Sequence, residues 1–103
     1  MRCLAIVRFP APAGLSGAKL RAVLEDGVPR YQDLPGLHRK YFVGNATHGG
    51  GIYEWASRAA ADAFYNGTWR ERLRAVYGAV PQIEFFDVHA VVDNDAHTMH
   101  IDA

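Results

Sequence analysis

Four short apolar runs alternate with two helical stretches, and this order restricts the possible folds more than any other feature. The apolar runs cover residues 2–9, 37–44, 52–55 and 83–92. They are rich in Val, Ile, Leu and aromatic residues and end at turn signals, which is typical of strands. The chain has 103 residues, a length that fits one domain.

The first helical stretch is predicted to begin after Ser16, a residue type that often caps helix N-termini. Leu20, Leu24 and Val28 recur at four-residue spacing and form one apolar stripe. Pro29 is expected to kink or end this helix because proline lacks the backbone N–H that the helix needs.

The second helical stretch is predicted to begin at Ser57 and to be interrupted at residues 66–67, which are Asn-Gly. It resumes over residues 68–77, and Gly78 ends it. Residues 45–51 lie between the second and third runs and end in three glycines, so they are predicted to form a turn.

The resulting order is β-α-β-β-α-β, in which right-handed crossovers place the first and third strands at the centre of the sheet. We therefore predict a ferredoxin-like α+β plait with an antiparallel four-stranded sheet and helices on one face. Residues 1–92 are expected to form the single domain, and residues 93–103 a polar C-terminal arm or frayed end.

The fourth run carries apolar side chains in both alternating sets. Residues 83, 85 and 91 point one way, whereas residues 86, 88, 90 and 92 point the other, and all of them are apolar. Helices can cover only one face, so we expect the open face to pair with a second copy in a homodimer. The alternative is that these strands are simply apolar and partly exposed.

Composition excludes several classes of protein. The chain has 11 Lys+Arg and 11 Asp+Glu, and this neutrality gives no reason to expect nucleic acid or an anionic membrane as a partner. No apolar stretch approaches the ~20 residues that span a bilayer. The single Cys3 cannot form an intrachain disulfide, which favours a reducing cytoplasm. His97 and His100 lack a third ligand nearby in sequence, so no metal site is expected.

Aromatic residues gather on the third strand and the second helical stretch, where Tyr53, Trp55, Phe64, Tyr65 and Trp69 lie. Between a sheet and a helix rich in alanine they could wall a pocket for a small molecule. They could equally form a plain aromatic core, and the sequence leaves both interpretations open.

Three cationic or basic residues, His38, Arg39 and Lys40, are consecutive on the second strand. Strict alternation would place His38 and Lys40 on one face and Arg39 and Tyr41 on the other. They could bind an anion or move a proton. The competing interpretation is electrostatic, with Arg8–Glu54 and Lys40–Glu84 as cross-strand pairs.

Four segments together resemble the YdhR-like monooxygenase family of the dimeric α+β barrel superfamily. They are PGLHRK at 35–40, GGGIYEW at 49–55, AAADAF at 59–64 and IEFFDV at 83–88. The resemblance runs from the first strand to about residue 92. Haem-degrading members of the superfamily have a haem-binding histidine on the second helix. The second helical stretch of this chain has no histidine, so haem is not expected.

The resemblance implies a homodimer packed sheet to sheet, with a pocket between the sheet and helices of each subunit. It also implies oxidation of a small aromatic or enolisable substrate by O2 without metal, flavin or other cofactor, the substrate supplying electrons after it loses a proton. We assign Lys40 and His38 as candidate catalytic residues. The candidate substrate-binding residues are Tyr41, Tyr53, Trp55, Phe64 and Trp69.

Two other functions fit the same pattern. The chain could form a non-catalytic small-molecule-binding or stress-related dimer with the same pocket. It could also be an isomerase or lyase of the superfamily that uses an acid/base residue without O2.

Overall fold

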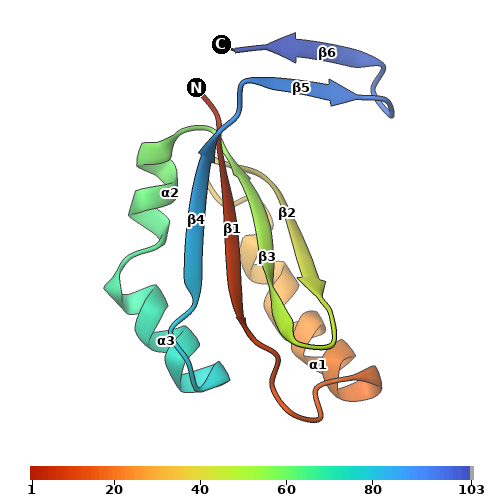
Figure 1. Ribbon diagram of the computed structural model, residues 1–103, viewed down its shortest axis with the longest axis vertical. Coiled ribbons are helices and arrows are strands. Elements are labelled where there is room, and N and C mark those ends of the chain that lie inside the picture. Colours follow the sequence, from red (N-terminus) through yellow and green to blue (C-terminus); the bar gives the residue numbers. More distant parts are fainter. Residues whose placement is uncertain (103) are drawn as a thin grey trace.

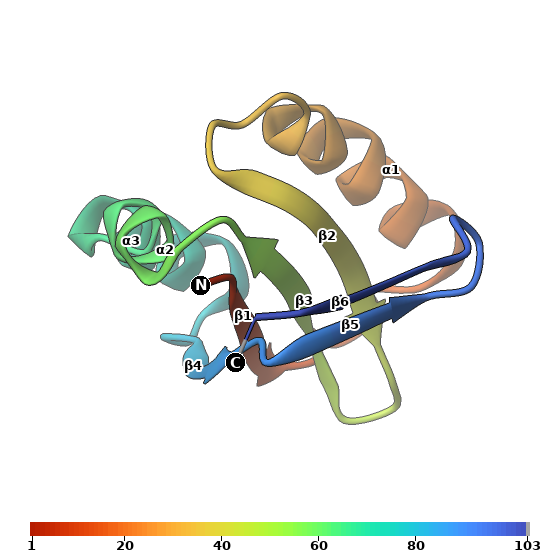
Figure 2. The same cartoon turned by 90° about the horizontal axis from the view of Figure 1, so that it is seen from above.

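A four-stranded antiparallel sheet in the order β2-β3-β1-β4 carries helices on one face (Figures 1 and 2). The computed structural model describes residues 1–102, so Ala103 of the predicted arm lies outside the described residues. The elements of this sheet and its helical layer are β1 (Cys3–Pro10), α1 (Gly17–Gly27), η1 (Val28–Tyr31, a 3-10 helix), β2 (Leu37–Gly44), β3 (His48–Trp55), α2 (Arg58–Phe64), α3 (Gly67–Tyr77) and β4 (Gln82–Asp87). This arrangement confirms the predicted ferredoxin-like plait.

The core lies between the sheet and the helices and is centred on β1. Cys3 pairs with Trp55 and Ala5 with Tyr53 in the β1–β3 register, so these side chains project from the same face. All of them are buried, as is Val7. α2 and α3 complete the core with Ala61, Tyr65 and Trp69.

The helix boundaries follow the predicted caps in most places. The Ser57 side chain accepts a hydrogen bond from the Ala60 N–H, as predicted for a cap. Asn66, predicted only to interrupt the helical stretch, also caps α3, because its side chain accepts a hydrogen bond from the Trp69 N–H. Gly78 adopts a left-handed conformation with φ of 75° and ends α3. α1 ends at Gly27, just before Pro29. Ser16 occupies the N-cap position of α1, but its side chain makes no capping hydrogen bond.

The predicted turn over residues 45–51 is wrong in its extent, because β3 already begins at His48. Asn45 closes the shorter turn: its Oδ1 accepts hydrogen bonds from the Thr47 and His48 N–H groups. The three glycines belong to the strand and lie opposite the C-terminal half of β1. They are needed there for close approach: a Cβ at Gly50 would lie 1.9 Å from the carbonyl oxygen of Val7.

The predicted fourth strand over 83–92 is also wrong, because it consists of two strands in different sheets. β4 ends at Asp87, where its partner β1 begins with Cys3, so no neighbouring strand remains to pair with. The chain turns at residues 88–89 and forms a separate hairpin of β5 (Ala90–Asp93) and β6 (Thr98–Ile101), which lies beyond the end of the main sheet (Figure 1). Much of the predicted polar arm is therefore a strand of this hairpin.

The open face of the sheet is a mixture of apolar side chains and ion pairs. Leu4, Ile6 and Ile52 are half-buried there. The charged residues pair differently from the prediction: Arg2 lies 3.9 Å from Glu54, and Arg8 lies 3.7 Å from Glu84.

Lys40 takes no part in these pairs, because it lies opposite Tyr53 and so faces the helices. None of the described helices has the length and apolar character needed to cross a membrane.

Candidate functional site

The space predicted between the sheet and the second helical stretch is filled by aromatic side chains. Trp55 donates a hydrogen bond from Nε1 to Tyr65 Oη at 3.0 Å. The Tyr65 and Trp69 ring centroids are 4.8 Å apart, and Phe64 packs on Trp55 at 5.2 Å. Trp55 is 1% exposed and Trp69 3%. Trp55, Phe64 and Trp69 therefore form part of an aromatic core and do not wall a pocket.

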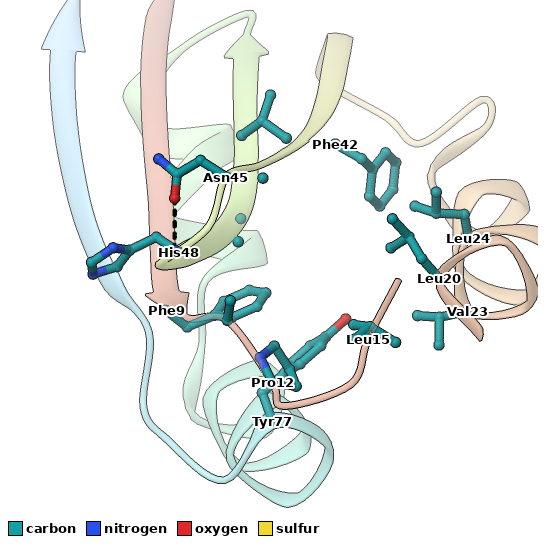
Figure 3. Close-up of a pocket in the computed structure, with 15 residues that line it drawn as sticks. Phe9, Pro12, Leu15, Leu20, Val23, Leu24, Phe42, Asn45, His48 and Tyr77 are labelled. Carbon is teal, nitrogen blue, oxygen red and sulfur yellow. Dashed lines mark hydrogen bonds between the residues drawn. The ribbon is translucent and has the colours of Figure 1, made fainter. Parts of the chain in front are cut away.

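A cleft lies instead between α1 and the sheet. No residue of α1 is buried, so the helix stands away from the strands. Its apolar stripe, with Leu20 and Leu24, faces Phe42 and Phe9 across a cavity of about 420 Å³ (Figure 3). This volume lies within the range of small-molecule pockets, and the lining is mostly apolar.

Glycines of β3 and a stacked aromatic pair shape this cleft. Gly49 and Gly50 line its floor and leave room above the strand. The rings of Phe9 and Tyr77 stack with centroids 4.2 Å apart and line the same cavity. A flat apolar molecule could therefore lie against the backbone of β3 and the faces of the Phe9 and Tyr77 rings.

A second cavity, of about 220 Å³, extends the cleft toward Lys40. Both cavities are lined by Phe9, Val23, Leu24, Phe42, Gly50 and Tyr77. These shared walls make them two parts of one cleft, which we call the α1 cleft. Its Lys40 end also contains Asp26, Arg30 and Arg72, so the charged groups gather at one end of an otherwise apolar space.

The Lys40 amino group lies within a cage of three aromatic rings. Its Nζ is 3.4 Å from the ring centroid of Tyr31, 3.8 Å from that of Phe42 and 4.5 Å from that of Tyr53. Gly51 makes this packing possible: a Cβ there would lie 2.9 Å from Lys40 Cε and 2.8 Å from the Tyr53 ring.

Burial, followed by the positive charge of Arg72, lowers the pKa of Lys40 to about 7. The ring faces oppose this shift because they attract the ammonium form. Lys40 has no ion pair within residues 1–102, and the carboxylate of Asp26 is already bonded to Arg30 at 3.0 Å. A lysine in this state can accept a proton near neutral pH.

The pKa of Tyr53, in the same cage, is shifted in the opposite direction from that of Lys40. Burial, with smaller contributions from Tyr31 and Tyr65, raises its pKa well above the ordinary range of tyrosine. Its hydroxyl therefore stays protonated at neutral pH and can act as a hydrogen-bond donor.

The predicted site residues thus separate into three groups. Lys40 and Tyr53 meet in the α1 cleft, where Tyr53 forms the border of the core, and Trp55, Phe64 and Trp69 belong to the core. Tyr41 lies on the open face opposite Ile52 and is 53% exposed.

His38 is exposed and sits at a register shift between Leu37 and Arg39, without a partner on β3. This bulge breaks the alternation by which His38 and Lys40 were assigned to one face.

Sequence reasoning missed several residues of the cleft, namely Phe9, Tyr31, Phe42, Arg72 and Tyr77. A signal for the location was present, because the stripe of α1 and the glycines of β3 are both visible in the sequence. Nothing in the sequence indicates that this stripe faces a cleft, whereas the aromatic residues of α2 and α3 fill a core.

Comparison with known proteins supports the fold. No protein-family model matches the sequence, and no curated protein matches it. The structure is similar to NE2512, a protein of unknown function from Nitrosomonas europaea, with 22% identity over 84% of this chain and 88% of that one and a TM-score of 0.65.

It is also similar to a monooxygenase from the gene ActVA-Orf6 of Streptomyces coelicolor in complex with the ligand nanaomycin D. The identity is 22% over 82% of this chain and 84% of that one, and the TM-score is 0.59. At these identities, the two similarities establish a shared fold.

Proposed function

We propose that the protein is a cofactor-independent monooxygenase of the YdhR-like kind that oxidises a small aromatic or enolisable substrate with O2 in the cytoplasm. The observation that carries this proposal is the amino group of Lys40. Its pKa is lowered to about 7, it has no ion pair within residues 1–102, and it lies at the charged end of an apolar cleft large enough for a flat ligand.

In the proposed reaction Lys40 removes a proton from an activated CH2 group of the substrate. The resulting carbanion lies beside the Lys40 ammonium and near Arg72, and these charges stabilise it. The carbanion transfers an electron to O2, and the two radicals combine to a peroxide anion. The Lys40 ammonium returns its proton to this anion, which gives a hydroperoxide. Loss of water leaves a ketone, so CH2 plus O2 gives C=O plus H2O and no external reductant is needed.

The apolar walls of the α1 cleft support this chemistry in two ways. They remove water from around the carbanion, which would otherwise be reprotonated, and they strengthen the interaction with the cations. They also suit an aromatic substrate, because Phe9, Phe42 and Tyr77 present ring surfaces. The likeness to a monooxygenase that binds nanaomycin D adds support at the level of the fold.

Oxygen consumption with anthrone and quinol substrates tests the proposal. We expect catalysed uptake above the uncatalysed rate, with one O2 consumed per ketone formed from an anthrone. No uptake above background across a broad panel would reject it. Conversion of a substrate without O2 would instead indicate an isomerase or lyase, and tight binding without conversion would indicate a non-catalytic binding protein.

The same proposal includes a homodimer formed through the open face of the sheet. Tyr41, Val43 and Phe86 are exposed there beside the half-buried Leu4, Ile6 and Ile52. The β5–β6 hairpin exposes Val92, Met99 and Ile101. A monomer would leave these apolar side chains in water, whereas a second copy would cover them.

Sedimentation at micromolar concentration should therefore give a dimer, and Phe86→Glu should weaken it at least about 100-fold because a carboxylate would be buried in an apolar interface. Val80→Glu provides the control, since Val80 is equally exposed but lies in the loop between α3 and β4, outside the strands of the sheet. A monomeric wild-type protein, or equal weakening by both substitutions, would contradict the dimer.

A further inference from the structure

We infer that Lys40 is also a covalent capture site, which forms an imine with an aldehyde or ketone bound in the α1 cleft. The inference rests on the cage, on the cleft and on the finding that no carboxylate within residues 1–102 forms an ion pair with the Lys40 amino group. It uses the cleft assigned above and does not depend on the oxygenation reaction.

Imine formation requires an amine that is unprotonated and free of a carboxylate. Lysines acquire this state in an apolar pocket or beside another cation, and Lys40 has both. Three ring faces surround its Nζ, and Arg72 lines the same cavity. The ionisable side chains that line this cavity besides Lys40 are Asp26, Arg30, Tyr31, Tyr53, Arg72 and Tyr77.

Asp26 is the carboxylic acid among these groups, and it already forms an ion pair with Arg30. Asp26 bonds to Arg30 through Oδ2 at 3.0 Å, so it does not hold Lys40 as an ammonium partner. Burial and then Arg72 lower the pKa of Lys40 to about 7, which agrees with the geometry. An amino group that remains half-unprotonated at neutral pH is a competent nucleophile.

The reaction balances with groups in the cleft. The Lys40 nitrogen attacks the carbonyl carbon and forms a C–N bond, and a proton passes from nitrogen to oxygen to give a carbinolamine. The C–O bond then breaks with release of water as the C=N bond forms, so no oxidant or reductant takes part. The proton that leaves with the hydroxyl comes from the carbinolamine nitrogen, and Tyr53, whose raised pKa keeps it protonated, can donate a hydrogen bond in the cage.

The shape of the cleft selects the carbonyl compound. Next to the cage the walls are Phe9, Phe42 and Tyr77, and the space beyond them is apolar. An aromatic aldehyde would therefore place its ring among these side chains and its carbonyl group toward Lys40. Water released by the reaction leaves an apolar environment, which favours the dehydrated imine.

Reductive trapping tests the inference. The full chain is incubated at pH 7 with benzaldehyde and sodium cyanoborohydride, which converts an imine into a stable benzyl amine. Peptide mapping then measures the labelling rate of each amine. The sequence has two lysines, Lys19 and Lys40, so exposed Lys19 on α1 is an internal control. We expect Lys40 to be labelled at least about tenfold faster than Lys19, because burial lowers its pKa and the cleft holds the aldehyde.

Two further measurements define the outcome. Lys40→Met should remove the fast label while circular dichroism confirms that the protein is folded. Raising the pH from 6 to 8 should accelerate labelling of Lys40 in the wild type. Equal labelling of both lysines, or labelling confined to the N-terminal amine, would overturn the inference. Oxygen uptake without trapping of Lys40 would overturn this inference and leave the monooxygenase proposal standing. Trapping of Lys40 without oxygen uptake would support this inference and reject the monooxygenase proposal.

Discussion

Replacing Lys40 by methionine should lower kcat/KM for oxygen uptake at least about 100-fold, because general-base catalysis typically contributes this much or more. Methionine keeps the length and apolar stem of the side chain, so the packing against Tyr31, Phe42 and Tyr53 is largely retained. Lys19→Met is the matched control: Lys19 is exposed on α1 and lines neither part of the cleft. Oxygen consumption and thermal unfolding of both variants provide the measurement.

The pH profile gives a second, independent readout of the same group. Only the unprotonated amine can accept a proton, so the rate should fall about tenfold per unit below pH 7 and level off above it, following the lowered pKa of Lys40. Arg72→Gln should move the inflection to higher pH, because the positive charge of Arg72 contributes to the lowering. A rate that is independent of pH between 5 and 9, or a Lys40→Met variant with wild-type activity, would remove Lys40 from the mechanism.

The fold was predictable because its signals are local. Apolar runs, the cap at Ser57, the interruption at Asn66 and the helix end at Gly78 each depend on a few neighbouring residues. The order of the elements then limits the topology through the handedness of crossovers. The prediction of the fourth strand was wrong for a nonlocal reason, because the end of β4 depends on the length of β1 beside it.

The candidate site was only partly predictable, because a cleft is a property of packing between elements. Tyr53 and Trp55 lie on the same strand face and both belong to the core, yet of the two Tyr53 alone also lines the cleft. The difference arises because Tyr53 lies beside Tyr31 and Lys40, and no sequence period encodes these contacts. Lys40 was a candidate from the sequence and lines the cleft, but the bulge near His38 changes the alternation from which its neighbours were assigned.

Gly50→Ala should destabilise the fold by about 3 kcal/mol or more, which places it among the largest effects of single substitutions. Its Cβ would lie 1.9 Å from the carbonyl oxygen of Val7 and 3.1 Å from Arg8 Cα. Both are backbone atoms of the central strand β1, so no side-chain rotation can relieve the overlap. The strands must separate, and separation breaks the pairing that positions the floor of the cleft.

Gly44→Ala is the control within the same sheet, because its nearest neighbour would be the carbonyl oxygen of His48 at 3.7 Å, an ordinary contact. Urea unfolding should therefore show a change of less than about 1 kcal/mol for Gly44→Ala. Thermal unfolding should show a loss of roughly 10 °C or more for Gly50→Ala, given the size of the chain. If both variants were equally stable, β1 and β3 could not approach each other as closely as the structure places them. The three glycines would then belong to a turn, as their composition alone suggests, and the α1 cleft would lose its floor.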